Sequence, residues 1–308
     1  MATTTSITTT YAGEFAGKYI SAALLSADTI EGGGITIKPN VKYKEVMKTL
    51  STDAIVKDAT CDFSDTSTIT LAEKILQPEE FQVNLELCKS DFASDWEAIS
   101  MGYSAFDELP SNFADFLIGH VAAKVAQKTE QTIWTGATAN AGEFNGFGAL
   151  LAADASVVDV VGTSVTAANV ITEMGKVVDA IPTSVYGKED LYIYVSSNVA
   201  RAYVRALGGF GASGLGANGV RNEGTTWFNN QDLAFDGVKI FVASGMADNT
   251  MVAAQKSNLF FGTGLLADSN EVKILDMADL DGSKNVRVVM RYTAGVQIGI
   301  GADIVYYA

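Results

Sequence analysis

The sequence has almost no histidine and almost no cysteine. Its 308 residues include one histidine, His120, and two cysteines, Cys61 and Cys88. Ser-His and Cys-His catalysis depend on histidine, and a zinc site made of thiolates needs four cysteines, so this composition argues against such chemistry. It also excludes a framework of several disulfides. Two arrangements stay open, a single Cys61–Cys88 bridge or two reduced, partly buried thiols.

Basic residues and long apolar runs are scarce too. Lys and Arg number 21 against 36 Asp and Glu, which gives a formal net charge of −15. Tight binding to a phosphate backbone needs clustered Lys and Arg, so we expect no tight binding of this protein to nucleic acid. Charged residues interrupt the longest apolar candidate, Phe113 to Ile133, so no membrane helix is predicted. Residues 1–10 are rich in Thr and lack the pattern of a secretory signal, so we expect synthesis in the cytoplasm.

The remaining composition is that of a globular protein, with 48% hydrophobic and 19% charged residues. The length suits either two compact domains or one domain with large extensions. Residues 1–40 are predicted to be an extension, because Thr3 to Thr10 is polar and Gly32 to Gly34 interrupts any regular element. Such a segment has little to bury and is expected to lie on another surface.

Residues 41–90 form a second unusual stretch. Strands are predicted at Thr66–Leu76 and Phe81–Leu87, on either side of Gln77 to Glu80. A two-stranded excursion is marginal alone in water and needs a partner surface. Lysines concentrate near its start, and they either pair with acidic groups of a neighbouring copy or form a solvated face. The residues predicted to contact another copy here are Lys42, Lys44, Lys48, Lys57, Glu79 and Glu80.

Helices dominate the middle of the chain and strands the end. The clearest helix runs from about Asn112 to Thr135 before Gly136, and its length of roughly 35 Å suits a structural strut. A helix at Ala167–Ile181, a strand at Leu191–Val195 and a helix at Ser196–Leu207 follow. This order predicts the α+β class. The late strands are predicted at Val238–Ala243, Met251–Ala254, Leu259–Thr263, Val272–Asp276, Val286–Tyr292 and Val296–Gly299.

Three features of the sequence are candidate chemical sites. Gly209 to Gly214 (GFGASG) matches G-x-G-x-x-G, but it follows a helix instead of a strand, so an exposed loop is favoured over a nucleotide site. Asp276, Asp279 and Asp281 either form a solvated acidic turn or bind a hard cation. His120 has no metal-ligand partner at helical spacing, which favours a packed or hydrogen-bonded side chain. No catalytic residue, cofactor or metal is predicted.

The order of these elements resembles that of tailed-phage major capsid proteins of the Hong Kong 97 type. Four stretches carry the resemblance. They are the helix end at Glu130–Gly136 (EQTIWTG), the turn at Phe144–Phe147 (FNGF), the strand and helix at Leu191–Leu207 and the Arg-bearing strands at Val286–Tyr307. The resemblance lies in the order of these motifs, which extends over nearly the whole chain.

The resemblance implies a Hong Kong 97-like capsid fold with an N-terminal arm, an extended two-stranded loop, a peripheral domain and an axial domain. The peripheral domain contains the long spine helix, at about 112–135. The axial domain carries the glycine-rich loop, so Gly209, Gly211 and Gly214 are predicted to face the centre of a pentamer or hexamer. The implied divisions are 1–40 for the arm, 41–90 for the extended loop, 91–164 with 248–308 for the peripheral domain and 165–247 for the axial domain.

The same resemblance implies a structural protein of the virion and no enzyme. Copies are expected to assemble as pentamers and hexamers into an icosahedral shell that encloses double-stranded DNA without sequence-specific binding. Assembly is expected in the host bacterial cytoplasm, with portal, scaffold and decoration proteins as further partners. Two alternatives stay open. One is another self-assembling structural protein (tail tube, fibre or surface layer), and the other, less favoured, is a nucleotide-binding enzyme.

Overall fold

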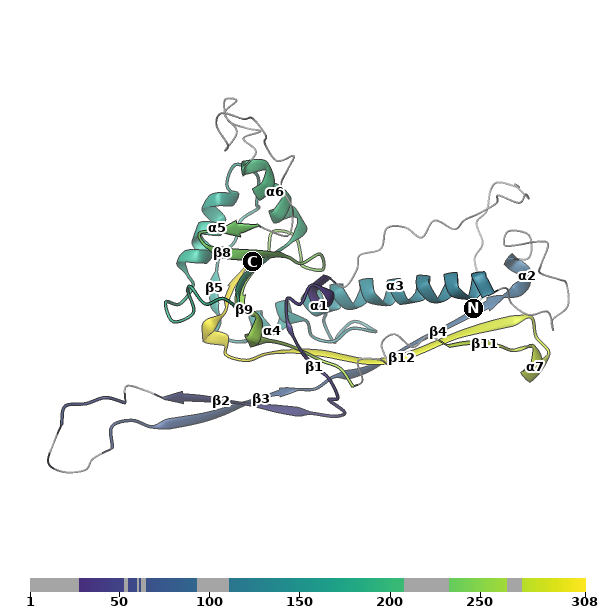
Figure 1. Ribbon diagram of the computed structural model, residues 1–308, viewed down its shortest axis with the longest axis horizontal. Coiled ribbons are helices and arrows are strands. Elements are labelled where there is room, and N and C mark those ends of the chain that lie inside the picture. Colours follow the sequence, from purple (N-terminus) through teal and green to yellow (C-terminus); the bar gives the residue numbers. More distant parts are fainter. Residues whose placement is uncertain are drawn as a thin grey trace.

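The computed structural model describes residues 28–52, 55–59, 61, 65–92, 111–207, 233–264 and 273–308. Three parts can be followed in Figure 1: a head of sheet and helices, a long layer in which one helix lies along extended strands, and a two-stranded hairpin that projects beyond the rest. No helix in these ranges is long and apolar enough to cross a membrane.

The head is built on a six-stranded mixed sheet. Helices α5 (Val170–Asp179) and α6 (Ser197–Leu207) pack against one of its faces. Val170, Met174, Val177 and Val178 of α5 recur at helical spacing and form one buried stripe, whereas Ile171 is exposed. The strands, in spatial order, are β5 (Val158–Val160), β13 (Val305–Tyr307), β9 (Met251–Gln255), β6 (Leu191–Val195), β8 (Val238–Val242) and β7 (Ala234–Phe235).

Strand β6 shows that both faces of the head sheet are buried. Successive side chains of a strand point to opposite faces of the sheet. Ile193 belongs to the cluster formed with α5 and α6, whereas Tyr194 packs against Trp134 in a second cluster on the other face. Both side chains are fully buried. Because both faces are covered, β6 (LYIYV) is apolar throughout instead of alternating with polar residues.

The long layer combines helix α3 (Ser111–Thr135) with a five-stranded sheet. Its longest strand, β12 (Asn285–Ile298), pairs with β4 (Glu79–Cys88) from Asn285–Cys88 to Ala294–Glu79. Val121 of α3 packs on Val288 of β12, which joins helix and sheet. The other strands of this sheet are β1 (Thr36–Lys38), β10 (Leu259–Gly262) and β11 (Lys273–Asp276). The short helices are α1 (Asp28–Glu31), α2 (Lys89–Phe92), α4 (Phe147–Ala153) and α7 (Ala278–Asp281), with 3-10 turns η2 (Lys256–Asn258) and η4 (Gly301–Asp303).

The projecting hairpin consists of β2 (Glu45–Thr52) and β3 (Ile69–Leu76), which pair antiparallel from Glu45–Leu76 to Thr52–Ile69. These two strands form a sheet of their own. We call this pair the hairpin.

Most predicted elements are confirmed, including the α+β class and the long helix that ends before Gly136. The two strands predicted on either side of Gln77 to Glu80 are present, but they do not pair with each other as a two-stranded excursion would. The strand that ends at Leu76 pairs with β2, which the sequence did not indicate, and β4 pairs with β12 instead. The strands predicted at 286–292 and 296–299 are one strand, β12, which continues through Gly295 because this residue pairs with Gly262 of β10. A Cβ at Gly295 would lie 2.9 Å from the Gln77 carbonyl oxygen. The sequence also predicts a short helix that Ser90 caps, and most of that helix lies outside the described residues.

Candidate assembly surface

One face of the hairpin presents apolar side chains to solvent. Alternate residues of each strand lie on the same face, and the register places Val46 opposite Ile75 and Leu50 opposite Leu71. Their exposed fractions are 46%, 42%, 63% and 71%, and Ile69 on the same face is 64% exposed. We call these five residues the apolar face of the hairpin. Lys48 and Glu73 lie opposite each other in its middle.

This exposure is costly for a strand pair that stands alone. Burying a side chain of this size contributes about 1.5–3 kcal/mol relative to leaving it in water. Two strands without a third element are marginal in water, and contiguous exposed apolar patches mark interaction sites. Within the described residues, no other element of the chain covers this face. The apolar face is therefore the candidate site for contact with another molecule.

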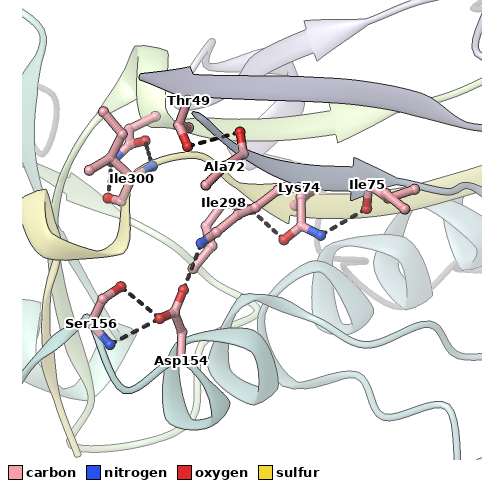
Figure 2. A network of polar contacts seen from close by, with 10 residues as sticks. Thr49, Ala72, Lys74, Ile75, Asp154, Ser156, Ile298 and Ile300 are labelled. Carbon is pink, nitrogen blue, oxygen red and sulfur yellow. Dashed lines mark hydrogen bonds and ion pairs between the residues drawn. The ribbon is translucent and has the colours of Figure 1, made fainter. Parts of the chain in front are cut away.

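The opposite face of the hairpin contacts the rest of the chain at its base. Leu76 is fully buried against Gly262, where a Cβ would lie 2.9 Å from Leu76 Cδ2. Lys74 Nζ lies 2.6 Å from Asp154 Oδ2, and Gln297 Nε2 donates to the Ile75 carbonyl at 2.8 Å (Figure 2). The hairpin thus turns one face to its own chain and the apolar face away.

The predicted lysines are spread along this region and do not form one site. Lys38 pairs with Glu45 at 3.0 Å. Lys44 lies 5.2 Å from the centre of the Tyr43 ring. Lys42, Lys44, Lys48 and Lys57 are exposed, as is Glu80, whereas Glu79 is half-buried at the start of β4. Gly209, Gly211 and Gly214 lie outside the described residues. None of these predicted contacts with another copy is tested within one chain, so they stay predictions.

The candidate chemical sites are tied into local structure. Asp276 pairs with Lys89 and accepts a hydrogen bond from the Ala278 amide, and Asp281 accepts one from the Ser283 amide. The part of the chain that the structure describes holds no group of three or more side chains suited to a metal ion. Cys61 and Cys88 are free cysteines, one exposed and one half-buried, so the Cys61–Cys88 bridge does not form in this structure.

A buried polar network that the sequence did not reveal joins α1 to α3. Glu130 is fully buried, and its carboxylate accepts from the Thr29 amide at 3.1 Å and from Thr29 Oγ1 at 2.5 Å. Trp134 Nε1 donates to the same hydroxyl at 2.8 Å. Burial raises the pKa of Glu130, although the bonds from Thr29 oppose that rise. This network holds residues 28–31 on the body of the protein.

The arrangement of head, long helix over an extended sheet and projecting hairpin defines the Hong Kong 97-type fold of phage capsid subunits. The fold expected from the resemblance is confirmed. No protein-family model and no curated protein matches the sequence, so the match is one of structure.

Three solved structures illustrate the likeness. The chain superposes on the capsid of a native GTA particle with a TM-score of 0.61 and 14% identity, over 94% of this chain and 93% of that one. For Mycobacterium phage Adephagia the values are 0.58 and 16%, over 93% and 91%. For the capsid of Myoviridae phage XM1 they are 0.55 and 12%, over 100% and 96%. At these identities the likeness is one of fold.

Proposed function

We propose that this chain is the major capsid protein of a tailed bacteriophage, which assembles with itself as pentamers and hexamers into an icosahedral shell. The observation that carries the proposal is the bare apolar face of the hairpin, in a chain that superposes on a capsid structure over 94% of its length. A neighbouring copy is the partner that supplies its missing cover.

The shape of the hairpin favours ring formation. The hairpin of one copy lies on a different surface of the next, which makes the contact head-to-tail. Head-to-tail contacts generate rings when the rotation between copies closes. Pentamers and hexamers are such rings. The predicted contacts at Lys42, Lys44, Lys48, Lys57, Glu79 and Glu80 would add charges to the interface between copies, which set register more than affinity.

The shell encloses double-stranded DNA without binding it by sequence. The net charge of −15 supports enclosure without tight binding, because acidic subunits do not bind the phosphates of DNA tightly. The protein is a structural component of the virion, made and assembled in the host bacterial cytoplasm, and it is not an enzyme. Portal, scaffold and decoration proteins are its further partners.

The proposed domains follow the predicted boundaries. Residues 1–40 are the N-terminal arm, 41–90 the extended loop, 91–164 with 248–308 the peripheral domain and 165–247 the axial domain. Helix α3 is then the spine helix, and the head sheet takes strands from both the axial and the peripheral part. Within residues 41–90, β2 and β3 project as the hairpin, whereas β4 lies along β12.

Negative-stain electron microscopy of the expressed protein tests the proposal. Closed icosahedral or spherical shells are the expected result. Rods, tubes or flat lattices contradict it and favour a tail tube, fibre or surface-layer subunit. A monomer that binds nucleotide in calorimetry, and loses that binding in Gly209→Val, favours the enzyme instead.

A variant in the apolar face sharpens the test. Leu71→Asp places a charge on that face and is expected to leave a folded subunit that forms no shells. Val161→Asp is the matched control, because Val161 is 86% exposed and lies in the head, away from the hairpin. If Leu71→Asp assembles as well as Val161→Asp, the apolar face is not the contact.

A further inference from the structure

The hydrogen bonds and ion pairs between strands β2 and β3 and the rest of the described chain all lie at the base of the hairpin. Glu45 of β2 pairs with Lys38 of the body, and Lys74 of β3 pairs with Asp154. The Ile75 carbonyl accepts from Gln297 between them. The body thus offers one cation to β2 and one anion to β3.

Lys74 is the outermost of these contacts on β3. It lies opposite Met47, and the strands continue past it to Ile69 and Thr52. Leu71 and Ile69 are exposed in that outer part. Within the described chain, only the base of the hairpin is bonded to the body. A small change in the angle between hairpin and body at Lys74 therefore moves the outer part of the apolar face by a larger distance.

Asp154 is held in place independently of Lys74. It follows α4, and its Oδ1 accepts from the Ser156 amide at 3.0 Å and from Ser156 Oγ at 2.6 Å, which leaves Oδ2 for Lys74 (Figure 2). Gly301 leaves room for this arrangement, since a Cβ there would lie 2.2 Å from Ser156 Oγ and 3.0 Å from Asp154 Oδ2. The turn after α4 and Gly301 of η4 therefore build one carboxylate acceptor for Lys74.

The surroundings of the pair make it stronger than an ordinary surface ion pair. The side chains of Lys74 and Asp154 are only 26% and 24% exposed. Hydrogen bonds lower the pKa of Asp154 to about 2. The bond from Lys74 has the largest effect, and the bonds from Ser156 have the next largest. Exposed ion pairs contribute little because solvent screens them and both side chains lose freedom. Here the acceptor is already ordered, so only Lys74 loses rotamer freedom.

We propose that Lys74 is a positioning residue for shell assembly: its bond to Asp154 fixes the direction of the hairpin, and so of its apolar face, before a neighbouring copy binds. The assembly role rests on the proposed function. Ordering the hairpin in advance reduces the entropy lost on association, which favours binding in one geometry. The second pair, Lys38–Glu45, holds the other strand, so the two pairs together oppose rotation of the hairpin about its own axis.

Spin-label distance measurements on dilute, unassembled subunits test the direction of the hairpin without reference to assembly. One label is placed in the outer hairpin at Thr70→Cys and one in the body at Ala139→Cys, with Cys61 and Cys88 changed to Ser. Lys74→Met, which keeps the aliphatic stem, is expected to broaden and shift the distance distribution. Lys74→Arg, which keeps the charge, is expected to restore the narrow one. A Lys74→Met distribution identical to that of unmodified Lys74 overturns the proposal.

Electron microscopy of the same variants without labels tests the consequence. Lys74→Met is expected to lose closed shells in favour of irregular particles, whereas Lys74→Arg and the charge-matched control Lys188→Met form them normally. Closed shells of Lys74→Met at normal yield overturn the positioning role. Failure of the unmodified chain to form shells overturns the proposed function, and the distance distributions then still decide whether Lys74 directs the hairpin.

Discussion

The head and the hairpin use the same kinds of side chains in opposite environments. Ile193 in the head sheet is fully buried between α5, α6 and the neighbouring strands, whereas Leu71 in the hairpin is 71% exposed. Both residues lie on strands with a regular ladder. The head therefore completes its core within one chain, whereas no described element covers the apolar face of the hairpin, and we propose that another copy covers it. Substitutions in the two regions should accordingly separate folding from assembly.

The largest effect on folding is expected in the head. Ile193→Ala removes a fully buried side chain and leaves a cavity, which should lower the free energy of unfolding by about 2–5 kcal/mol. Urea unfolding of subunits, followed by circular dichroism, measures the change. A loss well under 1 kcal/mol would mean that the head core is looser than its burial indicates.

A smaller effect is expected where α1 meets α3. Thr29→Val keeps the volume but removes the hydroxyl that donates to Glu130 and accepts from Trp134. Leaving buried polar groups without that partner should cost about 1–3 kcal/mol in the unfolding experiment. Thr135→Val is the matched control, since its hydroxyl bonds to Gln131 at an exposed position. Equal stabilities of the two variants would contradict the role of the network.

The same network predicts a pH dependence. The pKa of Glu130 is raised by burial above its ordinary value of 4.5, so the native state holds this proton more tightly than the unfolded chain. The stabilising contribution of the protonated group is fully present below that ordinary value and is lost as the pH rises through the raised one. Wild-type stability, relative to Glu130→Gln, should therefore fall with rising pH. A flat difference between the two proteins would show that Glu130 titrates normally.

The smallest effect on folding is expected in the hairpin. Leu71→Ala removes a side chain that is exposed in the free subunit, so its free energy of unfolding should change by no more than about 0.5 kcal/mol. Shell yield should nevertheless fall sharply, because the variant removes apolar area from the proposed contact. Sedimentation of assembly reactions measures that yield. A large loss of subunit stability would show that the hairpin packs on its own chain.

The sequence predicted the head and the long helix well because their signals are local. Apolar residues at helical spacing mark α5, and the run LYIYV marks β6. The sequence did not predict β2 or its pairing with β3 in the hairpin. Strand β2 (EVMKTLST) is a mixed apolar and polar strand among lysines, and its pairing with β3 depends on contacts that no short window contains.

The candidate site was predicted only in outline. A partner for residues 41–90 was predicted from their two-stranded pattern, but the five residues of the apolar face follow from the register of β2 and β3. The bonds Lys74–Asp154 and Thr29–Glu130 join residues 80 and 101 positions apart, so nothing in the local sequence indicates them. Both depend on how distant elements pack, which only the fold determines.

The central claim is that a neighbouring copy covers the apolar face of the hairpin. It is tested most directly by thiol labelling of Leu71→Cys, with Cys61 and Cys88 changed to Ser, in free subunits and in assembled particles. Ala139→Cys, exposed on the body, is the reference. The account predicts fast reaction at position 71 in subunits and strong protection in shells, while position 139 of the reference variant reacts rapidly in the free subunit. Equal reactivity of position 71 in subunits and shells would contradict it.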